Sequence, residues 1–398
     1  MVWGVRLVLL IVWVGLLMHK IQEIFNLSYD EYCNHFNPTT DQDKVAYSIM
    51  NCKSGKLGCN ISICDDCGHL QTHNNSCRNR HCPCCQAVLK ELWIDSRKSE
   101  VIDAPYFHVV FTLPAELNPL IYANQKLLYP LLHKCVSQTL LELSADKKYL
   151  GATPGIIQIL HTWGQELNFH PHIHCIVAGA GLTNAKQFKR SSKDFYIPVK
   201  VLASKFRGKF LAMLQELFAS NKLIFSSSCK ELQNSYTWNE FRDSLYLKQW
   251  IPFIKETFNG FGNAIDYLGR YTHRIAISNS RIKSLTNTHV IFSAKDYRTG
   301  ETKDVTITQV EFIRRFLMHV LPCGFQKIRY YGFLNNRYKK INLKLICKLT
   351  GKQLFQSLYV EMSIDELLLT IWNVNIHLCP NCGCDHFRHA GRTFHNRN

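Results

Sequence analysis

The chain of 398 residues has few acidic side chains, with 30 Asp and Glu against 47 Lys and Arg, which leaves a net charge of +17. This excess favours a polyanionic partner, nucleic acid before an anionic membrane surface. The sequence also lacks long repeats and low-complexity segments, and a hydrophobic content of 46% excludes a disordered protein. The composition therefore predicts a globular protein of roughly two or three domains that binds nucleic acid.

Long apolar runs are lacking too, and the run that stands out, Leu7 to Leu17, spans only eleven residues. A helix that crosses a bilayer needs about 20 apolar residues. No small-residue cleavage site of a signal peptide follows the run. Residues 1–18 are therefore interpreted as an apolar leader. This leader has three possible explanations: a signal anchor, a buried helix, or an upstream extension of the reading frame. The cytosolic character of the remaining chain favours the last two. We therefore expect no membrane association.

Cysteine is abundant, and nine of the 17 cysteines fall between Cys33 and Cys85. Close Cys-x2-Cys pairs in a long chain are typical of zinc in a reducing compartment, not of a disulfide framework. We expect one tetrahedral zinc ion bound by Cys64, Cys67, Cys82 and Cys85. The neighbouring Cys and His residues leave the choice of four ligands open and allow a second ion: these are Cys52, Cys59, Cys77, Cys84, His69, His73 and His81.

Two further features complete the zinc-related pattern. Arg78 and Arg80 lie between the two cysteine pairs, where we expect them to contact a nucleic-acid backbone. Near the other end of the chain, Cys379 and Cys382 form another Cys-x2-Cys pair, with Cys384, His386 and His389 within reach as a second small zinc site. We accordingly expect a zinc-binding module at 19–100, a catalytic domain at 101–345 and a tail at 346–398.

A histidine pair, His172 and His174, lies in the β-type run 172–178. Side chains alternate between the faces of a strand, so both imidazoles point to one face. Two imidazoles a few ångströms apart supply half of a divalent-metal site. A polar turn separates this run from the preceding strand 156–163 in a hairpin pattern. For the third ligand Gln165 is a candidate, and His161 and His170 compete for that role.

A tyrosine pair, Tyr267 and Tyr271, is spaced by four residues in a segment expected to be helical. This spacing places both phenols on one helical face. Together with the histidine pair they indicate phosphodiester transesterification, in which a metal ion polarises the phosphate and a phenolate attacks it. Either pair alone has a purely structural interpretation; their occurrence together in a basic chain with a cysteine cluster favours the catalytic one.

Basic and aromatic residues alternate from Lys327 to Lys340, a pattern that suits single-stranded nucleic acid because cations bind phosphates and rings stack on bases. We expect Arg329 and Arg337 in this stretch, and Arg274 after the tyrosine segment, to contact DNA. Helices are expected at 19–50, with a break at Pro38, and at 86–104, 115–149, 201–222 and 311–320. Strands are expected at 106–113, 156–163, 172–178 and within 288–308.

Six stretches together resemble the insertion-sequence-91-type rolling-circle transposases, which belong to the HUH endonuclease superfamily. They are NSCRNRHCPCCQ (75–86), PYFHVVFTLP (105–114), HTWGQELNFHPHIHCIV (161–177), YLGRYTHRIAIS (267–278), EFIRRFLMHVLPCGFQKIRYYG (311–332) and CPNCG (379–383).

The resemblance implies an α+β fold, in which an antiparallel-sheet palm flanked by helices follows the zinc module. It implies that Tyr267 or Tyr271 becomes joined to the 5′ phosphate of a nicked DNA strand, with no nucleotide cofactor. His172, His174 and Gln165 would bind catalytic Mg²⁺ or Mn²⁺, and the enzyme would act in the bacterial cytoplasm, at the nucleoid. A catalytically inactive zinc-containing DNA-binding regulator and a replication-initiator or relaxase-type nickase are the competing hypotheses.

Overall fold

The computed structural model describes residues 20–191, 197–250, 252–256, 269, 276–296 and 299–393. It contains helices and antiparallel sheets, so the expected α+β class is confirmed. The apolar leader at 1–18 lies outside the described residues. Within the part of the chain that is described, no helix combines the length and apolarity needed to cross a bilayer.

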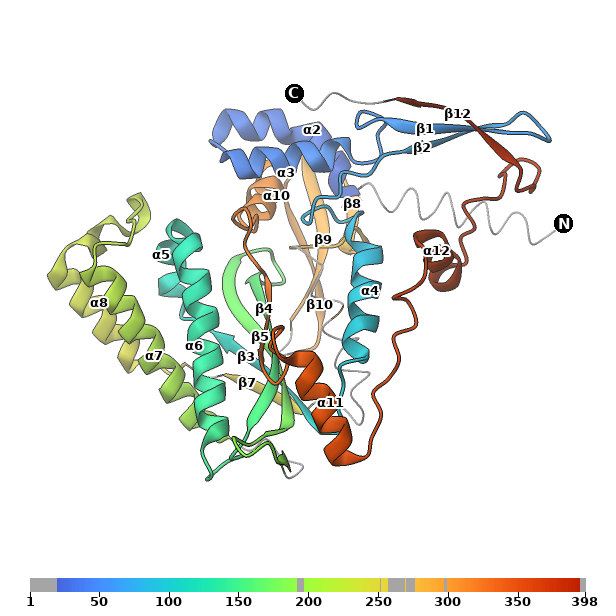
Figure 1. The fold of residues 1–398 in the computed structure, drawn as a ribbon. Helices are drawn as coiled ribbons and strands as arrows, with labels where there is room; N and C mark the ends of the chain where they lie inside the picture. Colours follow the sequence, from blue (N-terminus) through green and yellow to red (C-terminus); the bar gives the residue numbers. More distant parts are fainter. Residues whose placement is uncertain are drawn as a thin grey trace.

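A central antiparallel sheet forms the palm of the molecule (Figure 1). Its strands run in the order β11-β4-β5-β3-β7, and the short strand β6 pairs with β5. The predicted strands at 106–113, 156–163 and 172–178 are confirmed; the second begins three residues earlier than expected, and the third extends at both ends. The bounds are β3 (Tyr106–Thr112), β4 (Thr153–Trp163), β5 (Phe169–Leu182), β6 (Phe188–Arg190), β7 (Phe253–Glu256) and β11 (Ile328–Gly332).

Helices cover both faces of the palm, so the side chains of its long central strands are buried on both sides. On one face Phe107 and Phe111 pack into the main core with helices α5 (Asn118–Ala123), α6 (Gln125–Ala145) and α7 (Val199–Ala219), and α8 (Ser235–Leu247) lies beyond them. On the other face Tyr106 and Ile176 pack in a second cluster with residues of α4 (Gln86–Lys98) and α11 (Lys339–Thr350).

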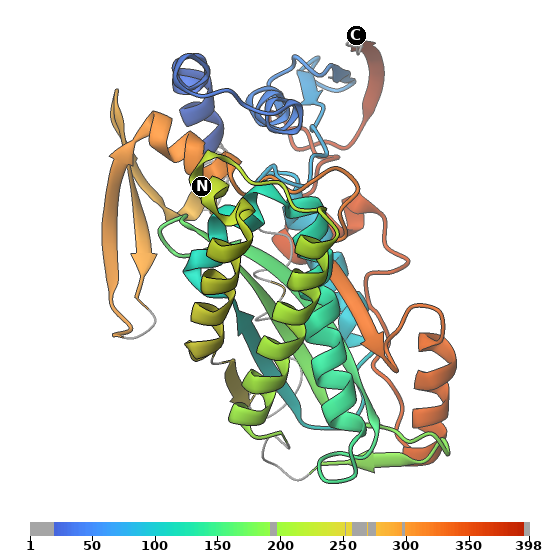
Figure 2. The same cartoon turned by 90° about the vertical axis from the view of Figure 1, so that its left-hand side faces the viewer.

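The amino-terminal helices α2 (Lys20–His35) and α3 (Thr40–Asn51) dock on a distant part of the chain. A capping box formed by Thr39 and Gln42 begins α3. Helix α2 packs on α10 (Gln309–Leu317), where the Phe25 and Phe316 rings lie 5.4 Å apart, edge to face. A second sheet, formed by β8 (Ile282–Leu285), β9 (His289–Lys295) and β10 (Thr302–Thr308), projects beside this contact (Figure 2).

The third sheet joins the two ends of the chain. Strand β1 (Cys59–Cys64) lies between β2 (Leu70–Asn74) and β12 (Phe387–Thr393), and both pairings are antiparallel. Residues beyond 346, which we treated as a tail, thus run through α12 (Ile364–Trp372) and return to the amino-terminal module. In Figure 1 this sheet forms a long ribbon that extends away from the palm.

Gly332, at the end of β11, can be used to test how tightly β11 packs against β4 at the edge of the palm. Its φ is +63°, and an added Cβ would lie 1.6 Å from the carbonyl oxygen of Pro154 at the start of β4. Gly324 is a matched control, because its φ is +71° but nothing lies within 4 Å of its Cβ position. Gly324→Ala should cost about 1 kcal/mol of unfolding free energy from the positive φ alone. Gly332→Ala should cost about 2–4 kcal/mol, since steric overlap adds ~1–3 kcal/mol. Urea unfolding measures both; equal losses would show that the β11–β4 contact is not tight.

Candidate active site and metal centres

The histidine pair lies on the central strand β5, and both side chains point to the face that α4 covers. Residues i and i+2 of a strand share a face, and here the two rings converge so that the Nε2 atoms of His172 and His174 are 3.0 Å apart. This separation matches two adjacent corners of an octahedral site, for which a metal–nitrogen distance of about 2.1 Å gives an edge of ~3.0 Å. The predicted common face is confirmed.

The third histidine of the site is His161 on β4. It pairs with His172 across the β4–β5 ladder, and one ring nitrogen of each of the three histidines lies within 4.8 Å of the others. The ring of His161 stacks on Trp163 at 4.7 Å, and the Lys327 ammonium lies over that indole at 4.8 Å. Three imidazoles fill only part of an octahedral coordination sphere, so a metal ion held by this trio could still bind other ligands.

Gln165, the candidate third ligand from the sequence, lies in the turn between β4 and β5. Its side-chain oxygen accepts a hydrogen bond from the Lys295 backbone at 3.5 Å, and its carbonyl oxygen accepts one from Arg281. The metal role of Gln165 stays a prediction, whereas the geometry directly favours His161, one of the competing residues.

Hydrogen bonds fix the orientation of the two β5 imidazoles. The Nδ1–H group of His172 donates to the carbonyl oxygen of His170 at 2.6 Å. The Nδ1 atom of His174 lies 2.8 Å from Nε2 of His108, on β3. Both contacts occupy Nδ1 and leave Nε2 facing the other histidines. Such outer hydrogen bonds orient ring ligands and set their tautomer in metal sites. The contact between His108 and His174 could not be predicted from the sequence, because it depends on the β3–β5 register.

Burial keeps these histidines neutral. It lowers the pKa of His172 to about 3, with a further lowering from neighbouring His170. Burial also holds the pKa of His174 well below its ordinary value, and His172, His108 and Lys327 add to the effect. A neutral imidazole has a free lone pair, which is the form that binds a metal ion. The residues therefore fit a divalent cation of the transition series, for which imidazole is a better ligand than for Mg²⁺.

Tyr267, Tyr271 and Arg274 lie outside the described residues. Gly269, midway between the tyrosines in sequence, is described, and it is buried and helical. An added Cβ at Gly269 would lie 2.2 Å from Cδ1 of Ile94 on α4. Ile94 belongs to the hydrophobic cluster that also contains Ile159, the partner of His174 on β4. Gly269 itself thus lies against the helix that covers the histidine face.

The four thiols predicted to bind one zinc ion divide between two groups, which corrects that ligand set. Cys82 and Cys85 lie with Cys52 and Cys77, and their four sulfur atoms lie within 4.8 Å of one another. The Cys85 sulfur is 3.5 Å from those of both Cys52 and Cys77. Such distances exclude disulfides at about 2.05 Å and approach the ~3.8 Å edge of a zinc tetrahedron. Hydrogen bonds from these neighbouring thiols hold the pKa of Cys85 far below its ordinary value, which favours the thiolate.

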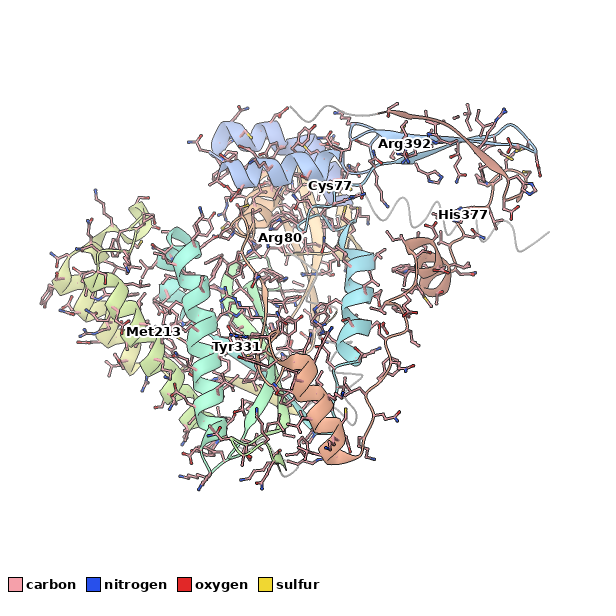
Figure 3. The ribbon with its side chains drawn as sticks, in the orientation of Figure 1. Cys77, Arg80, Met213, Tyr331, His377 and Arg392 are labelled. Atoms are coloured by element: carbon pink, nitrogen blue, oxygen red, sulfur yellow. The ribbon has the colours of Figure 1, made fainter. Side chains whose placement is uncertain are left out.

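The physical reason for this division is the β1–β2 hairpin. Cys64 and Cys67 lie at its turn, whereas Cys52 and Cys77 lie at its open end, where the Lys53 N–H group donates to the Asn75 carbonyl. Five paired residues of extended strand separate the two ends by about 17 Å, at ~3.4 Å per residue. Cys64 and Cys67 instead lie within 4.8 Å of Cys379 and Cys382. Figure 3 shows Cys77 at the base of the ribbon and Arg392 along it.

The arginines expected to contact DNA have different environments. Arg80 is partly buried, and its guanidinium donates to the carbonyl oxygens of Pro322 and Phe325, so it joins the zinc module to the palm. Arg78 and Arg337 are exposed, as a phosphate contact requires. Arg329 is half-buried and lies over the Phe325 ring at 5.4 Å. The segment from 327 to 340 is therefore partly a strand of the palm, β11, and not only a nucleic-acid surface.

Comparison with known proteins identifies the class. The family described as a putative transposase matches residues 155–341, and the family described as a transposase zinc-binding domain matches residues 24–113. The putative transposase y4qJ of Sinorhizobium fredii (strain NBRC 101917 / NGR234) is 41% identical over 335 residues, which cover 83% of this chain and 84% of that protein. The transposase for insertion sequence element IS801 of Pseudomonas savastanoi pv. phaseolicola is 30% identical over 301 residues, 73% of this chain and 69% of that protein. No solved structure matches.

The fold and these matches define a transposase that carries an amino-terminal zinc-binding domain. The chain belongs to the insertion-sequence-91-type transposases, and the resemblance seen in the sequence motifs is confirmed. It is thus a DNA-processing enzyme by family, with DNA as its partner.

The histidine trio predicts the order of metal affinities among three variants. His161→Ala should weaken Mn²⁺ binding as much as His172→Ala, because each removes one ring nitrogen of the trio. Gln165→Ala should change the affinity less than twofold. Isothermal titration with Mn²⁺ measures all three, with His289→Ala, an exposed histidine on β9, as the control. A large loss in Gln165→Ala together with an unchanged His161→Ala would restore the ligand set predicted from the sequence.

His108 should act on the metal through His174. His108→Phe should lower Mn²⁺ affinity about 10- to 100-fold, the usual effect of losing an outer hydrogen bond. His108→Gln should recover most of the loss, because its amide can still bond to Nδ1 of His174. The same titration separates this role from simple packing, for which Phe would be the better replacement and Gln the worse one.

Proposed function

We propose that this transposase nicks and joins single-stranded DNA at the ends of its insertion sequence by metal-assisted tyrosine transesterification, in rolling-circle-type transposition. The observation that carries the proposal is the buried histidine trio on a sheet face whose covering helix, α4, contacts Gly269 between the two tyrosines. A divalent metal ion, Mg²⁺ or Mn²⁺, would supply Lewis-acid polarisation of the scissile phosphate. His161, His172 and His174 would hold that ion.

The chemistry of the chain's own residues follows from this arrangement. The phenol oxygen of Tyr267 or Tyr271 forms a bond to phosphorus and loses its proton, while the bond from phosphorus to the 3′ oxygen breaks and that oxygen takes up a proton. The DNA keeps a free 3′ hydroxyl, and its 5′ phosphate stays on the tyrosine. Because the phosphodiester is exchanged and not hydrolysed, a 3′ hydroxyl can reverse the step and join strands without a nucleotide cofactor.

Positive charge supports binding of the DNA backbone. The chain carries a net charge of +17, and Lys327 is placed beside the histidine trio through its contact with Trp163. Arg78 and Arg337 provide exposed cations farther out. Phosphate contacts dominate nucleic-acid affinity. Loss of a metal ligand should therefore affect cleavage far more than binding. We place this activity on DNA in the bacterial cytoplasm.

The competing function is a zinc-containing DNA-binding regulator without catalysis. Its affinity for DNA would be the same, but no covalent product would form. The clustered histidines argue against it, because a polar trio that is largely buried costs stability that a regulator has no need to retain. A replication initiator or relaxase would share the cleavage chemistry; the match to the transposase zinc-binding domain favours the transposase.

The tyrosine pair provides the test that separates cleavage from binding. Wild-type protein incubated with single-stranded DNA from an element end and Mn²⁺ should form a covalent adduct on a denaturing gel. The double variant Tyr267→Phe with Tyr271→Phe should form none, yet bind the DNA within about twofold, because only two hydroxyl groups are lost.

The roles of the two tyrosines are expected to differ, since two phenols cannot occupy one in-line position at once. At least one single variant should still form the first adduct, and each should fail in complete transposition. Tyr330→Phe is the matched control, because its phenol oxygen accepts hydrogen bonds from Trp93 and Arg97 on α4. Mass spectrometry of the DNA-linked peptide identifies the nucleophile. An adduct on Tyr330, or an undiminished adduct in the double variant, would place the nucleophile elsewhere.

A further inference from the structure

Two turns at opposite ends of the chain have the same sequence pattern and the same backbone conformation. Residues 64–68 and 379–383 both read Cys-x2-Cys-Gly. In each turn the glycine N–H group donates to the carbonyl of the first cysteine, at 2.9 Å for Gly68 and 2.8 Å for Gly383. Both glycines have positive φ, +71° and +78°, a conformation that glycine adopts without strain. Each turn therefore presents two thiols in the same local geometry.

The two turns face each other. The Cys64 sulfur lies 3.6 Å from that of Cys382, and the Cys67 sulfur lies 3.6 Å from that of Cys379. Within the first turn the two sulfurs are 3.4 Å apart, and the Cys67 N–H group donates to the Cys64 sulfur at 3.4 Å. These distances are far longer than a disulfide bond of about 2.05 Å and close to the ~3.8 Å edge of a zinc–thiolate tetrahedron.

The sheet that connects the turns has almost no hydrophobic core of its own. Most side chains of β2 and β12 are exposed, and Leu70 on β2 is 59% exposed. Cys64 and Cys379, by contrast, are only 1% and 3% exposed. A small sheet without apolar burial needs another source of stability, and metal binding is one of the few that suffice.

We propose that Cys64, Cys67, Cys379 and Cys382 bind a zinc ion of their own, whose ligands come from opposite ends of the chain and which holds residues 379–393 on the amino-terminal module. This site is separate from the group of Cys52, Cys77, Cys82 and Cys85. The match to the transposase zinc-binding domain ends at residue 113, so it includes only half of the ligands.

Cys384 is the nearest competitor for a ligand position, because its sulfur lies 3.2 Å from that of Cys64. Comparison of the two turns places Cys384 outside the ligand positions. The carbonyl of Cys384 accepts the N–H group of Cys379 at 2.7 Å, and in the first turn the carbonyl of His69 accepts that of Cys64 at 2.9 Å. Cys384 thus occupies the position of His69, after the glycine, and Cys382 occupies the position of Cys67.

The first experiment counts zinc in full-length protein by elemental analysis. The wild type should contain two zinc ions per chain, and Cys379→Ser with Cys382→Ser should contain one fewer. Cys384→Ser and Cys323→Ser, an exposed cysteine outside both groups, should retain both ions. Equal zinc contents in the wild type and in the double variant overturn the proposal. Loss of an ion in Cys384→Ser with retention in Cys382→Ser overturns the ligand set.

The second experiment tests the link between the chain ends. A protease site is placed at residues 352–356, between α11 and α12 and before the Ser357 contact with Asp95, and the full-length protein is cleaved there after purification. In the wild-type background the carboxy-terminal fragment should co-elute with the larger part in gel filtration. In the Cys379→Ser, Cys382→Ser background it should separate, while helical circular dichroism of the larger part stays unchanged. Co-elution in both backgrounds would show that strand pairing and the hydrogen bonds from Leu358 and Tyr359 to Asp95 hold the fragment without zinc, and would overturn the linking role of zinc.

Discussion

The antiparallel register between β4 and β5 is the constraint on which the candidate active site depends. It places His161 opposite His172 and Ile159 opposite His174, so the histidines share one face with the apolar residues that pack under α4. A shift of one residue would turn every side chain of β5 to the opposite face, where α6 and α7 pack. The long, doubly buried strands make such a shift costly, because it would bring polar imidazoles into the main core.

The zinc module packs closely against the palm and against helix α10. Helix α4 follows Cys85 directly and lies over the histidine face, and Arg80 from the same loop donates to carbonyl oxygens of the segment that precedes β11. Helix α2 packs on α10, some 280 residues later in the chain, where Ser28 donates to Gln309. Metal binding in the module is therefore coupled to the position of α4, which also lies against Gly269. This coupling gives a physical reason for one polypeptide to combine the two parts.

Local sequence patterns correctly predicted the features that depend only on residues close together in the chain. The common face of His172 and His174 follows from strand alternation alone, and the strands of the β4–β5 hairpin follow from apolar runs bounded by turn residues. The contacts that were missed are non-local. His108 meets His174 through the β3–β5 register, and Cys379 meets Cys67 across 312 residues. Spacing in the sequence could not show that a hairpin separates Cys64 from Cys82. The repeated Cys-x2-Cys-Gly pattern was, however, a signal that related the two distant turns.

Arg80 was assigned to DNA because arginines between the cysteine pairs of a zinc module suit contacts with a nucleic-acid backbone. In the structure the loop of residues 321–325 instead supplies carbonyl acceptors for its guanidinium.

Phosphorothioate substitution at the scissile phosphate tests most directly whether the histidine face holds the metal that acts in strand cleavage. Sulfur is a poor ligand for Mg²⁺ and a good one for softer ions such as Cd²⁺. If a metal bound by His161, His172 and His174 contacts the phosphate, the sulfur substitution should slow adduct formation in Mg²⁺ by at least about 10-fold. This slowing corresponds to ~1.4 kcal/mol of transition-state stabilisation. Cd²⁺ should restore the rate in the wild type but not in His161→Ala. Equal slowing in both metals, or full restoration in His161→Ala, would contradict the account.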